Sequence, residues 1–333
     1  MLFERCHEPR ASTPPPGTHV VFQPAVVRAA GSFLAHTTQG DMNSSAEPIT
    51  NTARPLVVRE EHDCFGGRMG YYSHTSIMTG TVMNFAVFVP PWNGRLHVPA
   101  LYFLAGLTCT EETFMIKAGA QRLAAELGLM LVTCDTSPRG LGLPGESVHW
   151  DFGVAAGFYV DADQAPWGAH YRMGSYVNLE LPSLIEANFP ARTDKRGIFG
   201  HSMGGHGALV TALRHRDRWH SVSAFAPISS PCACPWGEKA FSNYLGPNRE
   251  RWVDWDASEL MGACAYPGWI LVDQGDADQF LREQLKPDAL VQAAQKSGQA
   301  LLLRRQPGYD HSYWFIQTFV SDHLVHHAEI LAD

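Results

Sequence analysis

The stretch Arg196-Gly-Ile-Phe-Gly-His-Ser-Met-Gly-Gly-His-Gly-Ala-Leu-Val210 decides the fold. Ile198 and Phe199 are apolar residues that favour a strand, and an apolar run at helical spacing follows a few small residues later. Between them, Ser202 is the centre of Gly200-His-Ser-Met-Gly204, which matches the pattern Gly-x-Ser-x-Gly. Glycines on both sides let the chain turn sharply, so that the serine hydroxyl is lifted above the sheet. We therefore predict a strand, a tight turn and a helix with Ser202 as a nucleophile; the alternative is a glycine-rich turn in another kind of α/β protein.

Composition excludes several classes of function. The formal net charge of −8, with no basic cluster, argues against nucleic-acid binding, and no apolar run is long enough to span a membrane. The seven cysteines are an odd number scattered through a large chain, which indicates reduced thiols in a reducing compartment and hence a cytoplasmic protein. Cys232-Ala-Cys234 lacks a second pair at zinc-site spacing, so we expect no metal and no cofactor.

The first 55 residues differ from the rest of the chain. They contain turn and linker sequences such as Thr13-Pro-Pro-Pro-Gly17 and Asn43-Ser-Ser-Ala-Glu-Pro48, and no signal-peptide core. We expect residues 1–55 to be a poorly ordered N-terminal extension and residues 56–333 to be the catalytic domain. Met42 is a candidate alternative start.

From residue 56 onward, strand-like and helix-like runs alternate. Such alternation predicts a mainly parallel central sheet with helices on both faces, as in the α/β-hydrolase fold. The long segment 136–171 is rich in glycine, proline and aromatic residues, and we interpret it as the ordered wall of a pocket. Helices are expected at 175–187, which has a proline inside it, and at 313–331. The expected strands, named by their residues, are 84–90, 99–104, 129–134, 196–199, 221–226, 269–275 and 301–304.

A serine nucleophile needs a base within hydrogen-bond reach, and the base needs a carboxylate to orient it. In α/β hydrolases these groups follow the order serine, acid, histidine, on loops after successive strands. Here Ser202 is followed by the loop Asp276-Ala-Asp278 and then by His311, in the loop after the last strand. Spacing alone leaves both aspartates as candidates for the acid.

We expect four other histidines to have structural rather than catalytic roles. His201 and His206 flank the nucleophile and are expected to pack or shape the turn, whereas His326 and His327 are expected on a solvated or half-buried face of the last helix.

An oxyanion formed during acyl transfer requires two preorganised N–H donors. One is expected from Met203, directly after the nucleophile, at the start of the helix. The other should come from the turn Gly106-Leu-Thr108, after an early strand, where the N–H of Leu107 is the best candidate.

From about Cys64 to the C-terminus, the chain resembles the S-formylglutathione hydrolase (esterase D) family. The motifs that carry this resemblance are Gly106-Leu-Thr-Cys-Thr-Glu111, Asp135-Thr-Ser-Pro-Arg-Gly140, Trp150-Asp-Phe-Gly153, Ala156-Gly-Phe-Tyr-Val-Asp-Ala162, Tyr171-Arg-Met173, Gly200-His-Ser-Met-Gly-Gly-His-Gly207, Phe225-Ala-Pro227, Cys234-Pro-Trp-Gly237, Asp273-Gln-Gly275, Asp278-Gln-Phe-Leu281 and Gly308-Tyr-Asp-His-Ser-Tyr313.

The resemblance implies a catalytic triad of Ser202, Asp278 and His311, and so it chooses Asp278 as the acid. It also implies oxyanion donors at Leu107 and Met203. The family's cysteine beside the oxyanion turn corresponds to Cys109, a candidate redox-sensitive thiol; the alternative is a small buried residue that never reacts.

The implied reaction is hydrolysis of S-formylglutathione to formate and glutathione, a step in glutathione-dependent removal of formaldehyde. Arg172 and Lys239 are candidate contacts of the glutathione moiety. The assembly that we predict is a homodimer. Two other functions compete with this one. A general short-chain carboxylesterase would share every catalytic residue, and a binding protein on a hydrolase fold is disfavoured by the intact order of serine, acid and histidine.

Overall fold

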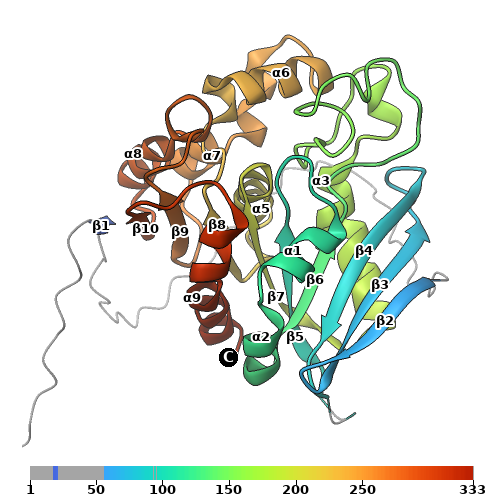
Figure 1. Ribbon diagram of the computed structural model, residues 1–333. Coiled ribbons are helices and arrows are strands. Elements are labelled where there is room, and N and C mark those ends of the chain that lie inside the picture. Colours follow the sequence, from blue (N-terminus) through green and yellow to red (C-terminus); the bar gives the residue numbers. More distant parts are fainter. Residues whose placement is uncertain (1–17, 22–55, 93, 95, 333) are drawn as a thin grey trace, which may run out of the picture.

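The computed structural model describes residues 18–21, 56–92, 94 and 96–332. A ten-stranded sheet lies at its centre, with the strand order β1-β10-β9-β8-β7-β5-β6-β4-β3-β2 (Figure 1). From β10 to β6, neighbouring strands are parallel, whereas β1 at one edge and β4, β3 and β2 at the other pair antiparallel. The strands are β1 (Thr18–Val21), β2 (Val57–Cys64), β3 (Gly67–Thr75), β4 (Val82–Val89), β5 (Val98–Leu104), β6 (Met130–Cys134), β7 (Ala191–His201), β8 (Ser221–Phe225), β9 (Ile270–Gly275) and β10 (Leu301–Gln306).

Helices cover both faces of this sheet (Figure 1). On one face α9 contacts β7, β8 and β9, while α1 and α2 contact β6; on the other, α4 and α5 contact β7. The α-helices are α1 (Glu111–Lys117), α2 (Gln121–Leu127), α3 (Met173–Ser175), α4 (Leu181–Asn188), α5 (Met203–Arg214), α6 (Pro235–Tyr244), α7 (Ala257–Ala263), α8 (Pro287–Ser297) and α9 (Tyr313–Leu331). The predicted α/β-hydrolase fold with a mainly parallel sheet is confirmed. None of the helices in the described ranges combines the length and the apolar character needed to cross a membrane.

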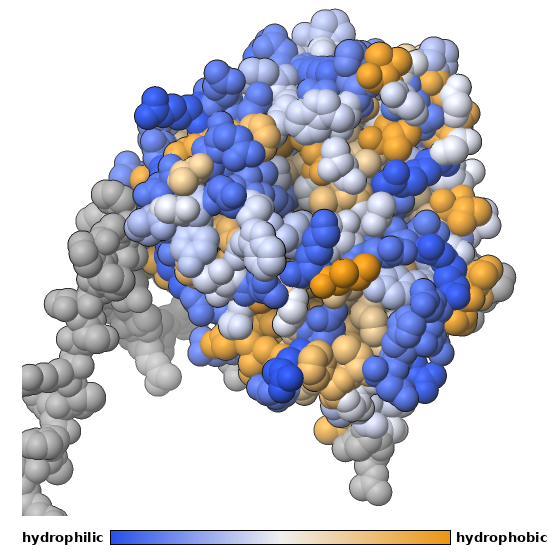
Figure 2. Space-filling view, in the orientation of Figure 1, coloured by the Kyte–Doolittle hydropathy of each residue, from blue (hydrophilic) through white to orange (hydrophobic). Residues whose placement is uncertain are grey.

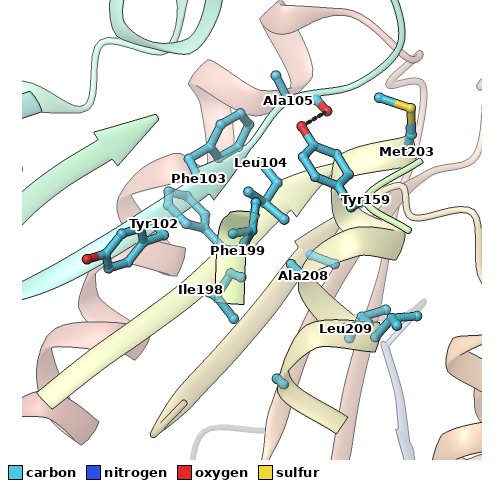
Figure 3. Packing of buried hydrophobic residues seen from close by; sticks show 14 of the residues in the cluster. Tyr102, Phe103, Leu104, Ala105, Tyr159, Ile198, Phe199, Met203, Ala208 and Leu209 are labelled. Carbon is cyan, nitrogen blue, oxygen red and sulfur yellow. Dashed lines mark hydrogen bonds between the residues drawn. The ribbon is translucent and has the colours of Figure 1, made fainter. Parts of the chain in front are cut away.

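The centre of the core lies where β5 and β7 pair, because both strands are covered on both faces. Phe103 of β5 stacks on Phe114 of α1 with ring centroids 3.8 Å apart, and Phe199 of β7 packs edge-on against Phe103 at 4.9 Å. Figure 3 shows Phe103 and Phe199 beside side chains of α5, which begins directly after β7. This packing fixes the point at which β7 passes into α5.

The expected helix at 175–187 is present, but it is not a regular α-helix throughout. The structure has α3, then a π-helical turn at Tyr176–Glu180, and then α4, in which Pro182 is the second residue. Proline has no N–H to donate, so a regular α-helix cannot run through it without losing a hydrogen bond. The proline therefore lies in the first turn of α4, where its missing donor costs little.

Two antiparallel strands, β2 and β3, were not predicted. Almost every residue of β2 is exposed, and its sequence Val57-Val-Arg-Glu-Glu-His-Asp-Cys64 does not alternate between polar and apolar residues. An edge strand with so little burial lacks the periodic signal from which a strand is recognised.

Within the expected N-terminal extension, the structure describes Thr18–Val21 alone. This segment forms β1, which pairs with Leu301–Arg304 of β10 at the edge of the sheet. The rest of the extension, including Met42 and the expected boundary near residue 55, lies outside the described residues and stays a prediction.

Buried hydrogen bonds attach α9 to the sheet. His323 of α9 bonds through Nε2 to Asp273 of β9 (3.0 Å) and through Nδ1 to the hydroxyl of Ser223 in β8 (2.8 Å). The same hydroxyl lies 2.8 Å from His327 Nε2, and His327 Nδ1 lies 2.7 Å from the hydroxyl of Ser221. All five side chains are shielded from solvent, so this serine, histidine and aspartate set holds the helix in place and is not open to a substrate.

Candidate active site

Ser202 lies at the sharp turn between β7 and α5, with φ 58° and ψ −119°. A positive φ is strained for a residue with a side chain and is typical of functional positions. The flanking glycines make the turn sterically feasible. A Cβ atom on Gly200 would lie 2.2 Å from the carbonyl oxygen of Gly204, and one on Gly204 would lie 1.9 Å from that of Leu104. The predicted strand, turn and helix are therefore present around the serine.

The structure brings His311 to Asp278. The Nδ1 atom of His311 lies 2.5 Å from Oδ2 of Asp278, while Oδ1 accepts a hydrogen bond of 2.8 Å from the N–H of Phe280. The other candidate, Asp276, instead accepts the N–H of Gly308 at 2.7 Å on the exposed side of the loop. A carboxylate can only accept, so Nδ1 of His311 carries a proton, and the neutral ring keeps its lone pair on Nε2.

His201 is a close neighbour of His311. Its ring centroid lies 4.4 Å from that of His311, and it directly precedes Ser202 in the chain, so all three side chains share one region. Within the described residues, no hydrogen bond joins the hydroxyl of Ser202 to His311; such catalytic bonds are often long in a free enzyme. Burial first, and repulsion by the protonated form of His311 second, lower the pKa of His201 well below its usual value, which keeps this ring neutral.

The turn after β5 is held against the nucleophile. A Cβ atom on Gly106 would lie 3.2 Å from the Cβ of Ser202, so the backbone here passes directly beside the serine. The hydroxyl of Tyr159 donates a hydrogen bond of 2.9 Å to the carbonyl oxygen of Ala105, as Figure 3 shows. Thr108, with φ 69°, donates its N–H to the carbonyl oxygen of Ala155 at 3.0 Å. These bonds fix the turn from both ends.

The N–H groups of Leu107 and Met203 have no hydrogen-bond acceptor among the described residues. Met203 is the first residue of α5, where an N–H group has no partner within the helix. Both belong to segments adjoining Ser202. They are the two donors that the sequence predicted for an oxyanion at this serine.

Cys109 lies two residues after Leu107 and is half-buried. Burial raises the pKa of its thiol, and the hydrogen bonds with Thr113 and Tyr313 offset this only in part. Its carbonyl oxygen accepts a hydrogen bond of 2.7 Å from Thr136 Oγ1, so its backbone is also held. The cysteine is thus close to the oxyanion turn, but its surroundings favour the thiol over the reactive thiolate.

Aromatic side chains from three separate segments lie beside His311 or in contact with its neighbours. Phe280 packs edge-on against His311 at 5.1 Å, and Trp236 of α6 lies 4.7 Å from Phe280. Trp150, from the long loop after β6, meets Trp236 edge-on at 5.7 Å. The expectation that the long loop forms a pocket wall agrees with this position. Phe280 and Trp236 lie in two motifs named above, but the sequence predicted no role for them, because nothing in their spacing relates them to His311.

The three other histidines considered in the sequence analysis, His206, His326 and His327, are all buried. His206 is buried and bonds through Nε2 to the carbonyl oxygen of Phe158 at 3.1 Å, as expected of a packing residue. The expectation for His326 and His327 was wrong: both are buried, because α9 packs its histidines against polar atoms of β8. Over the described residues, histidine, cysteine, aspartate and glutamate form no cluster of three or more that could hold a metal ion.

Comparisons with known proteins agree with this fold and sequence pattern. Residues 76–326 match the protein family described as "Putative esterase". The chain is 50% identical to S-formylglutathione hydrolase of Rattus norvegicus over 270 residues, which is 80% of this chain and 96% of that protein. It is 51% identical to S-formylglutathione hydrolase of Mus musculus over 272 residues, again 80% of this chain and 96% of the relative.

Among solved structures, an S-formylglutathione hydrolase from Agrobacterium tumefaciens has a TM-score of 0.79 and 45% identity, covering 82% of this chain and 99% of that one. A ferulic acid esterase at 20% identity, with a TM-score of 0.60, covers 79% of this chain and 99% of that one and shares the fold alone.

Proposed function

The chain belongs to the S-formylglutathione hydrolase family of esterases, and on this premise we propose that it hydrolyses S-formylglutathione to formate and glutathione. The observation that carries the proposal is the identity of about half of all residues over nearly the whole length of the two mammalian relatives. In a cell that oxidises formaldehyde as its glutathione adduct, this reaction releases glutathione for reuse.

We assign the catalytic roles to Ser202, His311 and Asp278. With Nδ1–H directed at Asp278, His311 takes the serine proton on Nε2 as Ser202 attacks the thioester carbonyl carbon. The oxyanion of the tetrahedral intermediate is held by the N–H groups of Leu107 and Met203. Its collapse expels the thiolate of glutathione, which takes up the proton from Nε2 of His311 and leaves the ring neutral again. His311 then deprotonates a water molecule, which hydrolyses the formyl-serine ester and frees formate.

Cys109 keeps its proposed role as a redox-sensitive thiol. Modification of its sulfur beside the oxyanion turn would place a bulky group where the thiolate of glutathione must leave. Support for this role comes from position, whereas the raised pKa of the thiol works against a rapid reaction. A cytoplasmic location and a homodimer are also predictions.

Steady-state kinetics test the proposed function. The values of kcat/KM for S-formylglutathione and for neutral short-chain esters such as p-nitrophenyl acetate should be compared on the same preparation. We expect the thioester to be preferred by several orders of magnitude. Equal values would favour the alternative, a general short-chain carboxylesterase, which needs the same catalytic residues.

A further inference from the structure

A cavity of about 570 Å³ lies between α6 and the long loop after β6. Its walls include Val148, Phe152 and Trp167 from the loop, and Lys239 and Asn243 from α6. In Figure 2 this face of the molecule is hollowed near its centre, below the place of α6 in Figure 1. Of the cavity-lining residues in the described part of the chain, Lys239 alone is a lysine or arginine. The catalytic steps proposed above make no use of this cavity.

Lys239 forms an ion pair with Asp151. Its Nζ atom lies 2.5 Å from Oδ1 of Asp151, and the two side chains are 33% and 17% exposed. The pair is thus neither buried nor fully solvated. It offers a cation and an anion side by side, and each retains capacity for further hydrogen bonds: two of the three donors on the ammonium and several lone pairs on the carboxylate.

The ion pair lies close to the catalytic centre through a series of ring contacts. Asp151 directly follows Trp150, and Lys239 lies one helical turn after Trp236 on the same face of α6. These two tryptophans touch each other, and Trp236 reaches His311 through Phe280, with successive ring centroids less than 6 Å apart. The two contacts from Trp236 through Phe280 to His311 measure 4.7 and 5.1 Å between ring centroids. An extended tripeptide spans about 10 Å, so its length is similar to that of these two contacts together.

Glutathione has one end that matches an ion pair. Its γ-glutamyl residue carries an ammonium and a carboxylate on the same carbon, whereas its glycine end carries a carboxylate alone. A lysine and aspartate pair is complementary to the zwitterion, because each charge meets its opposite and the total charge does not change. On a protein of net charge −8, an anionic peptide must be held by such local contacts, because long-range attraction does not favour it.

We propose that the Asp151–Lys239 pair is the recognition site for the γ-glutamyl end of the substrate. Lys239 binds the α-carboxylate, Asp151 binds the α-ammonium, and the cavity receives the γ-glutamyl stem. The inference rests on the proposed function, since it concerns the peptide part of the same thioester. The contacts are remote from the reacting carbon, so they are expected to lower KM without changing kcat.

The test combines variants with a modified substrate. Lys239→Met and Asp151→Asn are compared with wild type and with Lys296→Met, a control that removes an exposed lysine from α8. We expect KM for S-formylglutathione to rise about 10- to 100-fold in the first two variants, as for loss of a hydrogen bond to a charged group. The control should behave as wild type, and kinetics with p-nitrophenyl acetate should be unchanged in all of them.

The modified substrate is the formyl thioester of glutathione acetylated on its α-amino group. In wild type its KM should exceed that of S-formylglutathione by about 10-fold, and Asp151→Asn should abolish this difference. Equal KM values of the two thioesters in wild type would overturn the proposal, even if the variants failed to fold. Failure of the proposed function is a separate result, because wild type would then show no preference for S-formylglutathione over the ester.

Discussion

Replacing Asp278 by asparagine tests the assignment of the acid. In the structure, Oδ2 of Asp278 accepts the Nδ1 proton of His311 at 2.5 Å, and Oδ1 accepts the N–H of Phe280. An asparagine must keep its oxygen toward the N–H of Phe280, which turns its NH₂ group toward His311. The ring then has to accept at Nδ1 and carry its proton on Nε2, where it can no longer take the proton of Ser202.

The expected loss follows from this exchange of tautomers. In serine hydrolases with the same constellation, the change from aspartate to asparagine lowers kcat by about 10⁴, or about 5 kcal/mol of transition-state stabilisation. We expect a similar loss for Asp278→Asn, because its amide is fixed on both sides. Since the side chains are nearly equal in volume, the melting temperature should change little.

The matched control is Asp276→Asn, two residues earlier in the same loop. Asp276 is exposed and bonds to the N–H of Gly308, so its asparagine variant should retain activity within about twofold. Both variants are assayed by the loss of thioester absorbance with S-formylglutathione, and their melting temperatures are compared by circular dichroism. A harmless Asp278→Asn, or an Asp276→Asn variant that loses activity while remaining folded, would refute the reasoning.

Four further predictions follow from particular residues. Ser202→Ala should abolish hydrolysis and leave the melting temperature unchanged; residual turnover above background would point to another nucleophile. Alkylation should inactivate wild type but not Cys109→Ser, at a rate that rises about tenfold per pH unit up to pH 9, because burial raises the pKa of the thiol; equal inactivation of both would place the sensitive thiol elsewhere. Burial lowers the pKa of His326 to about 4, so below pH 6.5 this histidine takes up a proton in the unfolded state but not in the folded state. The free energy of unfolding therefore falls by about 2 kcal/mol between pH 7 and pH 5 because of this residue. In urea unfolding, His326→Gln should lose less stability over this range than wild type, and equal losses of stability would contradict the argument. A chain beginning at Met42 lacks β1 and exposes the edge of β10, so it should retain kcat but associate further than the full chain does at high concentration in sedimentation experiments; a truncation with the same association state and stability as the full chain would show that β1 does not protect this edge.

The local parts of the site could be predicted from sequence because each has a short-range cause. The turn at Ser202 needs glycines at fixed offsets, and the strand before it and the helix after it have clear periodicity. The loops that hold His311 and Asp278 follow strands of a parallel sheet, whose carboxyl ends meet at one edge. Spacing alone did not choose between Asp276 and Asp278, since both lie in the same loop and differ only in which way they face.

What could not be predicted depends on contacts between distant segments. The pairing of Asp151 with Lys239 joins residues 88 positions apart, and neither lies in a pattern that would predict the other. The burial of His326 and His327 was missed because histidine on a helix is usually read as a surface residue. The partners that bury them are backbone and serine atoms of β8, which periodicity does not reveal.

The hydrogen bonds that attach α9 to the sheet have a fixed direction. Burial alone would raise the pKa of Asp273, but hydrogen bonds from His323 and Arg304 outweigh it and lower the pKa to about 2, so the group is a carboxylate that only accepts. His323 must then donate from Nε2 and accept at Nδ1 from the hydroxyl of Ser223.

The hydroxyl of Ser223 has only one proton, which it donates to His323. It therefore accepts a hydrogen bond from Nε2 of His327, and Nδ1 of His327 accepts one from the hydroxyl of Ser221. The negative charge of Asp273 thus determines the tautomers of both histidines and the orientation of both hydroxyls. The same strand, β9, ends just before Asp278, whose carboxylate sets the tautomer of His311. One strand therefore polarises two imidazole systems, one sealed in the interior and the other beside the nucleophile.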